Sequence, residues 1–540
     1  MGLFGPGAKV NPTNPPDPSR LVRPLCFALL LFAATGAGAQ QVGAVAFPNS
    51  GAPAAQRSFL YGLAQLHNFE YDDAARAFRA AQEIDPGFAM AFWGEAMTRN
   101  HPVWMEQDLG AARRILERLG PSPAARIASG KTERERAYLG AVETLYGAGD
   151  KRARDLAYLD AMRQLHAAWP DDVDAAAFYG LALLGSAHNG RDDATYLRAA
   201  EMMERPFAAH PDHPGLAHYL IHSYDDPAHA RQGLPAARRY FTIAPAAPHA
   251  LHMTSHIYLA AGMWDEVVAA NEQATRVAAE RARSAGRTPG SCGHANMWLM
   301  YGYLQQGRPD EARRVLDLCR ASATSAGGLA VRAAEQDPLD PDNIPAASYV
   351  QMWSRYIIDT ARWDDPLVKE NLALGDLAGA TVTRAFVRVL AAAGRTLRLP
   401  GRHDESVRSG QAGADGLKSA RAEFQAARGR LDAFLATRAA GRDRYRTRAE
   451  VLDREVEALV LLSEQQVDAA VAALRAAAAA EAAMPVEFGP PFVDKPADEL
   501  LGDVLLGLGR KPEARAAYES TLERAPNRAA SVAGLARTRD

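Results

Sequence analysis

Small, aromatic and proline positions recur between polar positions along residues 57–97, in an order that predicts two packed helices. Small side chains at Gly62 and Ala74 would let two antiparallel helices approach closely, and Phe78 would fill the seam between them. Pro86 would end the second helix, because proline lacks the backbone N–H that a helix interior requires. The residues that follow Pro86 are therefore expected to begin the next helix.

The same arrangement recurs along most of the chain, with Gly180, Gly262, Gly307 and Gly502 at equivalent small or turn positions. A period near 34 residues is typical of stacked helical hairpins. The pattern resembles the tetratricopeptide-repeat (TPR) family. This resemblance implies an all-α, right-handed superhelical solenoid of antiparallel helical hairpins with a concave groove.

The predicted organisation has five parts along the chain. They are a signal peptide at 1–39, a disordered lead at 40–54, a TPR-like solenoid at 55–380 with a histidine-rich centre at 213–301, longer helices at 381–462 with a mobile loop at 401–418, and C-terminal TPR-like hairpins at 463–540. The loop prediction rests on a Gly/Ser-rich stretch of mixed charge without a period. A proline-rich insertion at 487–497 is either a stiff connector between helices or a loop folded over the groove.

The first 39 residues have the parts of an export signal. Arg20 and Arg23 precede an apolar run that ends in Ala37-Gly38-Ala39, and this order is typical of a secretory signal, here cleaved after Ala39. The run is short for a membrane span, and an uncleaved membrane anchor is the alternative. We therefore expect an exported protein, periplasmic or secreted, with no membrane span in the mature chain.

Two cysteines remain after cleavage. Cys292 falls at the start of a predicted first helix and Cys319 near the end of its second helix. Antiparallel pairing brings these ends together, so a disulfide is sensible in an oxidising compartment. Two separate buried thiols are the alternative.

Charge and motifs exclude several functions. The net charge is −3 with 23% charged residues, so no basic field points to nucleic acid. The sequence has no phosphate-binding loop, nucleophile elbow, dinucleotide fingerprint or haem-attachment motif. No enzyme class follows from a recognised catalytic motif.

Two His-x-x-x-His pairs, His218/His222 and His252/His256, lie 34 residues apart. Residues four apart share one face of a helix, and the spacing of the pairs equals the repeat period. The pairs should therefore occupy the same two places on neighbouring helices. Helices that pack at ~8–10 Å allow the four imidazoles to converge, and such a cluster would suit Zn²⁺, Cu²⁺ or Fe²⁺.

The TPR resemblance implies that further residues face the groove beside these four candidate ligands. In the repeat register, the additional ligands or groove residues are His249, Asp225, His294, Tyr301, His67 and His101. The general-base glutamate of the His-Glu-x-x-His motif is missing, so a protease of that type is not predicted.

Two functions are compatible with these patterns. The first is an exported scaffold that binds a partner protein, a peptide or a small ligand in its groove, with a histidine-clustered metal site. The second is a metalloprotein, either a metal carrier or a metal-dependent enzyme, that uses the two histidine pairs. Structural packing of the histidines is the third interpretation.

Overall fold

A computed structural model describes residues 41–325, 327, 329, 339, 344–397, 411–437 and 443–539. The predicted signal peptide lies outside these residues. The described residues are mostly α-helical, which confirms the all-α fold class; a two-stranded antiparallel ribbon joins β1 (Asn100–His101) to β2 (Glu106–Gln107). None of the helices in this part of the chain combines the length and apolar character needed to cross a bilayer.

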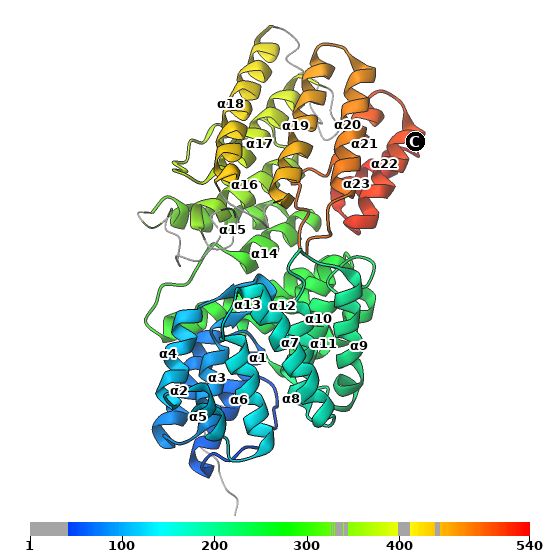
Figure 1. Ribbon diagram of the computed structural model, residues 1–540. Helices are drawn as coiled ribbons and strands as arrows, with labels where there is room; N and C mark the ends of the chain where they lie inside the picture. The colour runs from blue at the N-terminus through cyan, green and yellow to red at the C-terminus, as the bar shows by residue number, and fades with distance from the viewer. Residues whose placement is uncertain are drawn as a thin grey trace, which may run out of the picture. The chain divides into compact units, whose positions relative to one another are not determined.

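The N-terminal helices pack against their sequence neighbours as hairpins (Figure 1). A Cβ atom at Gly62 would lie 3.1 Å from the ring of the buried Phe78, which confirms the close approach predicted there. The elements are η1 (Pro53–Ala55), α1 (Gln56–His67), α2 (Tyr71–Ile84), α3 (Ala89–Met97), η2 (Pro102–Trp104), α4 (Leu109–Leu119), α5 (Pro123–Ala128), α6 (Glu133–Leu145), α7 (Lys151–Ala168), α8 (Val173–Leu184) and α9 (Asp193–Ala209).

The central helices carry the histidine-rich segment. They are α10 (Pro214–Ser223), α11 (Ala230–Ile243), α12 (Pro248–Ala260), α13 (Trp264–Ser284), α14 (His294–Gln305), α15 (Pro309–Ala323), α16 (Pro345–Thr360) and η4 (Pro366–Lys369). Both α10 and α12 begin at a proline, whose fixed φ suits the first helical position. The predicted register of the two histidine pairs is therefore confirmed. Gly262 and Gly307 have φ of 68° and 69°, in the left-handed region that favours glycine at a turn.

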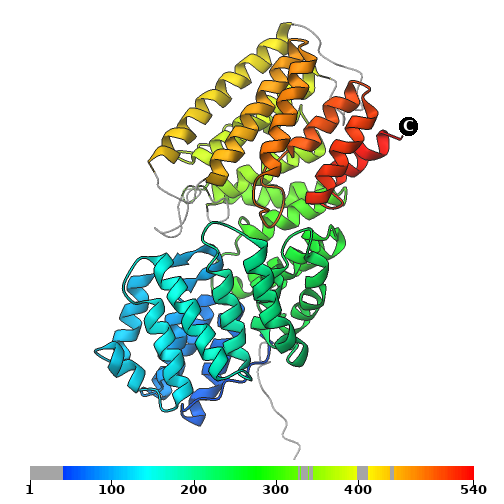
Figure 2. The same cartoon turned by 45° about the vertical axis from the view of Figure 1, so that its right-hand side comes forward.

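The C-terminal helices include the longer ones expected after residue 381, and Figure 2 shows them lying side by side. They are α17 (Ala378–Thr396), α18 (Gln411–Ala436), α19 (Asp443–Ser463), α20 (Val467–Ala482), α21 (Ala497–Gly507), α22 (Lys511–Arg524) and α23 (Ala529–Arg537). Residues 401–410 of the predicted mobile loop lie outside the described residues. Residues 411–418 are helical, so the loop prediction is wrong there. Leu417 is 2% exposed, because α18 packs on α17 and this partner gives it an apolar surface to bury against.

The prediction of a disordered lead at 40–54 is also wrong over its described residues. This segment is irregular, but Val42 and Phe47 are buried. The Phe47 ring stacks on Trp93 at 5.7 Å, and the Val42 carbonyl accepts a hydrogen bond from the Asn68 amide. Two apolar side chains that find buried sites hold the lead along the helices.

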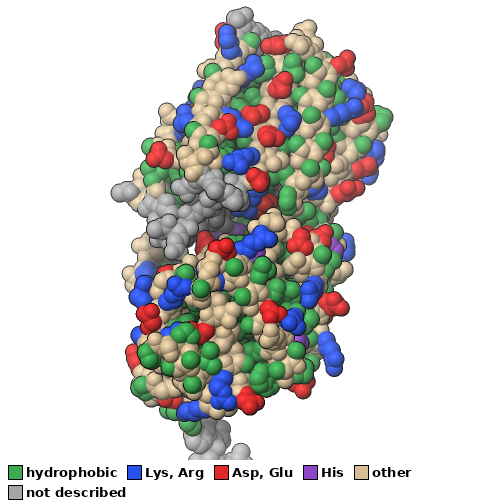
Figure 3. Space-filling view, viewed as in Figure 1, with side chains coloured by type: hydrophobic (Ala, Val, Ile, Leu, Met, Phe, Trp, Pro, Cys, Tyr) green, Lys and Arg blue, Asp and Glu red, His purple; other side chains and the backbone are tan. Residues whose placement is uncertain are grey.

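Cys292 and Cys319 are joined by a disulfide between the residues before α14 and the second half of α15, with Cα atoms 4.7 Å apart. The pairing is the one expected from antiparallel helices. On the face shown in Figure 3, acidic and basic side chains are interspersed, in keeping with the small net charge.

Candidate metal centre

The two histidine pairs lie on helices that are enclosed by other helices. Every residue of α10 is buried, as is every residue of α12 from Ala250 onward. Both helices carry apolar or small side chains around most of their circumference, which is typical of a buried helix. The four paired histidines are at most 5% exposed. Their imidazoles therefore need partners within the protein.

His252 and His256 face each other, with their Nε2 atoms 3.1 Å apart. The His252 Nδ1 lies 2.7 Å from Asn271 Oδ1. Asn271 Nδ2 donates to the Val267 carbonyl, so Oδ1 is the amide atom that accepts from His252. On the other side, His256 Nδ1 lies 2.5 Å from Asp225 Oδ2. Both outer nitrogens are thus held by oxygen atoms while both inner nitrogens converge.

Two imidazole nitrogens at this separation need a positive charge between them. A proton can supply it, if the Asp225 carboxyl donates to His256 and His256 donates to His252. A metal ion can replace that proton, since binding to histidine requires the neutral ring and releases protons. Two nitrogen ligands of a tetrahedral ion at ~2.0–2.1 Å lie about 3.3 Å apart. The observed spacing fits either occupant.

His294, at the start of α14, supplies a third imidazole to this pair. One donor atom from each of His252, His256 and His294 lies within 4.8 Å of the others. The His294 ring centroid is 4.6 Å from that of His252 and 5.8 Å from that of His256. We call these three residues the first histidine group. Three convergent imidazoles are a familiar ligand set for a transition metal.

His218 and His222 do not join that group, which differs from the predicted four-imidazole cluster. His218 Nδ1 donates to the His67 carbonyl at 2.7 Å, which turns its ring toward α1. The His222 ring centroid is 6.1 Å from that of His256. His218 instead lies beside His222 and His249, at centroid distances of 4.9 and 5.2 Å. We call His218, His222 and His249 the second histidine group.

The loop between α20 and α21 lies over the first histidine group. The Phe488 ring packs on His256 at 5.6 Å. Gly489 has φ of 99°, and a Cβ atom there would lie 2.7 Å from the Trp298 ring. Trp298 in turn packs against His256 at 4.3 Å. The insertion predicted at 487–497 therefore folds over the histidines, rather than only connecting helices.

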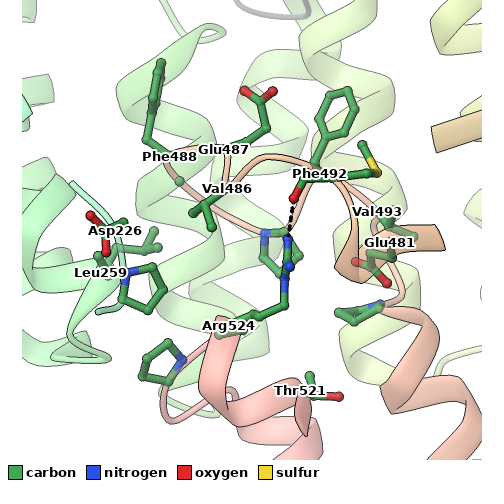
Figure 4. A pocket seen from close by; sticks show the side chains of 18 of the residues that line it. Asp226, Leu259, Glu481, Val486, Glu487, Phe488, Phe492, Val493, Thr521 and Arg524 are labelled. Atoms are coloured by element: carbon green, nitrogen blue, oxygen red, sulfur yellow. Dashed lines mark hydrogen bonds between the residues drawn. The ribbon is translucent and has the colours of Figure 1, made fainter. Parts of the chain in front are cut away.

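A pocket of about 960 Å³, partly open to solvent, adjoins the group. Asp225 and Phe488 line it and also contact His256. Figure 4 shows the Arg524 side chain reaching across its floor to the Met484 carbonyl, at 3.4 Å. Other lining residues are Asp226, Leu259, Glu481, Val486, Phe492, Val493 and Thr521. The mixture of apolar walls and a few polar groups is typical of a small-ligand site.

Burial sets the charge of these groups. It lowers the pKa values of His218, His222, His249 and His252 well below the ordinary range. Neighbouring histidines lower them further, since two positive charges repel. Burial also raises the pKa of Asp225 to about 7. The imidazoles are therefore neutral near pH 7, and a neutral ring is the form that binds a metal.

A second buried cluster, His67, Asp174 and His213, has its imidazoles fully engaged. Asp174 Oδ1 lies 2.9 Å from His67 Nε2 and 3.3 Å from His213 Nε2. The remaining His67 nitrogen lies 2.9 Å from the Tyr219 hydroxyl. The remaining His213 nitrogen accepts from the Leu216 N–H. With both ring nitrogens of each histidine in hydrogen bonds, this cluster is explained by packing.

Three predicted groove residues have different surroundings. His101 stacks on Tyr71 at 4.0 Å, away from both histidine groups. The Tyr301 hydroxyl accepts from Arg528 at 3.0 Å, and its side chain also lines the pocket. Asp225 lies within reach of the first group as the hydrogen-bond partner of His256.

Sequence reasoning missed Asn271, Trp298 and Phe488 as parts of the site. Asn271 lies on α13, one helix after the ligand that it orients. Trp298 is four residues after His294, a spacing that places both on one helix face and offers a readable signal. Phe488 is more than 230 residues beyond His256, and no local pattern indicates that contact.

No protein-family model matches this sequence, and no curated protein matches it. The chain is similar in structure to the TPR domain of P58(IPK), with 12% identity, 90% of this chain and 97% of that chain covered, and a TM-score of 0.19. It is also similar to yeast Tom70, with 11% identity, 90% and 95% coverage, and a TM-score of 0.29. Similarity at this level extends to no site, partner or activity.

Proposed function

We propose that this chain is an exported metal-binding protein of helical-repeat architecture, in which His252, His256 and His294 hold a transition-metal ion. The observation that carries the proposal is the pair of Nε2 atoms 3.1 Å apart, each opposite a nitrogen held by Asn271 or Asp225. Oxygen partners of this kind fix the orientation of metal-binding imidazoles and raise their basicity.

The donor set narrows the class of metal. Imidazole suits Zn²⁺, Cu²⁺, Ni²⁺ and Fe²⁺, whereas Mg²⁺ and Ca²⁺ prefer carboxylate, carbonyl and water oxygens. Three protein ligands leave a tetrahedral ion with one further position. The pocket that touches Asp225 and Phe488 offers space for a small ligand next to that position. A carrier and a metal-dependent enzyme both use such an arrangement.

Export is supported by two independent features. The first 39 residues have the order of a secretory signal, and Cys292 and Cys319 are bonded. Disulfides persist in oxidising compartments and are rare in the cytosol of mesophiles.

The test is the metal content of protein produced in its natural compartment without a histidine tag. Elemental analysis should find a transition metal, and the variant His252→Gln/His256→Gln/His294→Gln should lose one ion per chain. The matched control, His166→Gln/His210→Gln, removes two histidines outside both groups and should keep the full content. Metal at 100 times its Kd should also stabilise the apo protein by about 2.7 kcal/mol. Equal metal content in the triple variant and the parent would refute the proposal.

A second candidate function is the binding of a peptide or small organic ligand in the pocket. The specific observation is the pocket itself, with apolar walls at Leu259, Val486 and Phe488 and carboxyl groups at Asp226 and Glu481. A ligand that co-purifies equally with the parent and with the histidine variant would favour this function over metal binding.

A further inference from the structure

We propose that the second histidine group, His218, His222 and His249, binds a second transition-metal ion next to the first. The proposal rests on the proposed function for the neighbouring ion, but it uses three different imidazoles and different observations. Together the six histidines would form a two-ion centre.

The first observation is that the second group has nitrogens without partners. Among the described residues, the buried Nε2 atoms of His218, His222 and His249 make no hydrogen bond. His218 and His222 are 0% and 5% exposed. A buried polar atom left without a partner costs about 1–3 kcal/mol, and such atoms are few in native proteins. Three of them on adjacent rings indicate a bound group.

The second observation concerns the proton on His218. Its Nδ1 must carry hydrogen, because the atom 2.7 Å away is the carbonyl oxygen of His67. His67 is the last residue of α1, and carbonyls of the last turn lack partners within their own helix. The neutral His218 ring therefore has its lone pair on Nε2. This is the same division between an outer donor and an inner acceptor that Asn271 imposes on His252.

The backbone is adapted to hold His218 in this position. A Cβ atom at Gly215 would lie 2.3 Å from the His67 ring, so only glycine lets α10 approach α1 this closely. The carbonyl of His67 is then within reach of His218. Loss of this approach would free the ring to rotate, and the partnerless nitrogen would no longer have a fixed direction.

Phe69 forms a common wall for the three rings. Its ring centroid lies 4.3 Å from that of His218, 5.9 Å from that of His222 and 5.7 Å from that of His249. Its φ is 55°, a conformation that is unusual for a bulky side chain and that is found preferentially at functional sites. Packing explains why the rings contact Phe69, but it supplies no partner for their nitrogens.

The spacing within the second group resembles that of the first. The centroids of His218 and His222 are 4.9 Å apart, and those of His252 and His256 are 5.0 Å apart. The groups are contiguous, since His249 lies 6.3 Å from His252 and His222 lies 6.1 Å from His256. All ligands on offer are imidazoles, so the second ion belongs to the same class as the first, with Cu²⁺ and Zn²⁺ favoured.

The experiment is a titration of the metal-free full chain with Co²⁺, followed by optical absorption, and with Zn²⁺, followed by native mass spectrometry. The parent should bind two ions per chain. His222→Gln/His249→Gln should bind one, and His252→Gln/His256→Gln/His294→Gln should bind one. The far-UV circular dichroism of each variant must match that of the parent. His222→Cys, which keeps a metal-binding side chain, should retain two ions and shift the Co²⁺ spectrum toward thiolate ligation.

The outcomes separate the two proposals. One ion in the parent that is lost only in the His252/His256/His294 variant overturns the second ion and leaves the proposed function standing. One ion that is lost only in the His222/His249 variant overturns the proposed function and supports the second site. If the parent binds no ion, both proposals fail, and ordered water is then the partner of the buried nitrogens.

Discussion

Phe488 packs on the imidazole of His256, with ring centroids 5.6 Å apart, although the two residues lie on opposite sides of the histidine-rich segment in the chain. The contact comes from the loop between α20 and α21. Gly489 brings this loop against Trp298, which itself packs on His256. Loop and helices together limit how solvent reaches the first histidine group. A cover of this kind affects the rate of metal exchange more than the strength of the metal–nitrogen bonds.

Phe488→Ala should therefore accelerate the loss of metal to a chelator several-fold, while the temperature of unfolding changes little. Phe488 is 39% exposed, so truncation removes little buried area. Transfer of Zn²⁺ to a coloured chelator in a stopped-flow instrument measures the rate. The matched control is Phe492→Ala in the same loop, whose ring contacts Tyr445 at 5.6 Å. Equal acceleration in both variants would show that loop anchoring, and not the contact with His256, controls exchange.

Asn271→Leu should weaken binding at the first histidine group. The substitution removes the oxygen that accepts from His252 Nδ1, and the loss of an outer partner costs about 10–100-fold in metal affinity. Competition with a chelator of known affinity measures the change. Asn271→Asp keeps an acceptor and should restore most of the binding. Asn296→Leu, which removes a weaker hydrogen bond to the Cys292 carbonyl, is the control; an affinity for Asn271→Leu equal to that of the control contradicts the assigned role.

The sequence is sufficient to predict the hairpin array and the register of His218 and His252, because both depend on local features. Proline at the start of α10 and α12 and glycine at the turns fix these helices with little help from the rest of the chain. The ligand grouping is different. It depends on how far each helix is rotated about its axis, and that rotation follows from packing.

Two contacts that decide the grouping have no signal in the repeat pattern. The His67 carbonyl turns His218 away from His252, and the close approach at Gly215 makes this contact possible. Phe47 gives a similar lesson at the N-terminus. Its segment has no period, yet the ring is buried against Trp93, because tertiary contacts can order a stretch that lacks local preference.

Removal of the disulfide should destabilise the protein and also weaken the first histidine group. Cys292 lies two residues before His294 and is bonded to Cys319, 27 residues further on. Closing a loop of this length stabilises the folded state by about 3–4 kcal/mol. Cys292→Ala/Cys319→Ala should therefore lower the free energy of unfolding by about that amount, as measured by urea titration. Its Zn²⁺ affinity should fall because the start of α14 is less constrained.

The same comparison in the presence of a reductant provides the control for the disulfide. Reduced parent protein should match the double variant in both stability and Zn²⁺ affinity. A double variant with unchanged affinity would mean that packing of Trp298 alone holds His294 in place.

Glu481 should make the stability of the protein fall as the pH rises from 5 to 8. Burial at the edge of the pocket raises its pKa from 4.5 to about 7, although the Ala497 N–H and Arg524 oppose the shift. The folded state therefore prefers the protonated carboxyl. Its contribution to stability is complete below the unfolded pKa and is lost as the pH passes through the folded value. The full shift corresponds to at most about 3 kcal/mol, and solvent at the pocket mouth reduces this amount.

Glu481→Gln keeps an oxygen that can accept from the Ala497 N–H, which now meets Glu481 at 2.7 Å, and removes the ionisation. Urea titrations at pH 5 and pH 8 should show a smaller loss of stability in this variant than in the parent. The variant should also be the more stable protein at pH 8. Glu457→Gln, at an exposed position of α19, should follow the parent at both pH values. A parent and a Glu481→Gln variant with parallel pH profiles would show that the Glu481 carboxyl stays ionised, with solvent reaching it through the pocket.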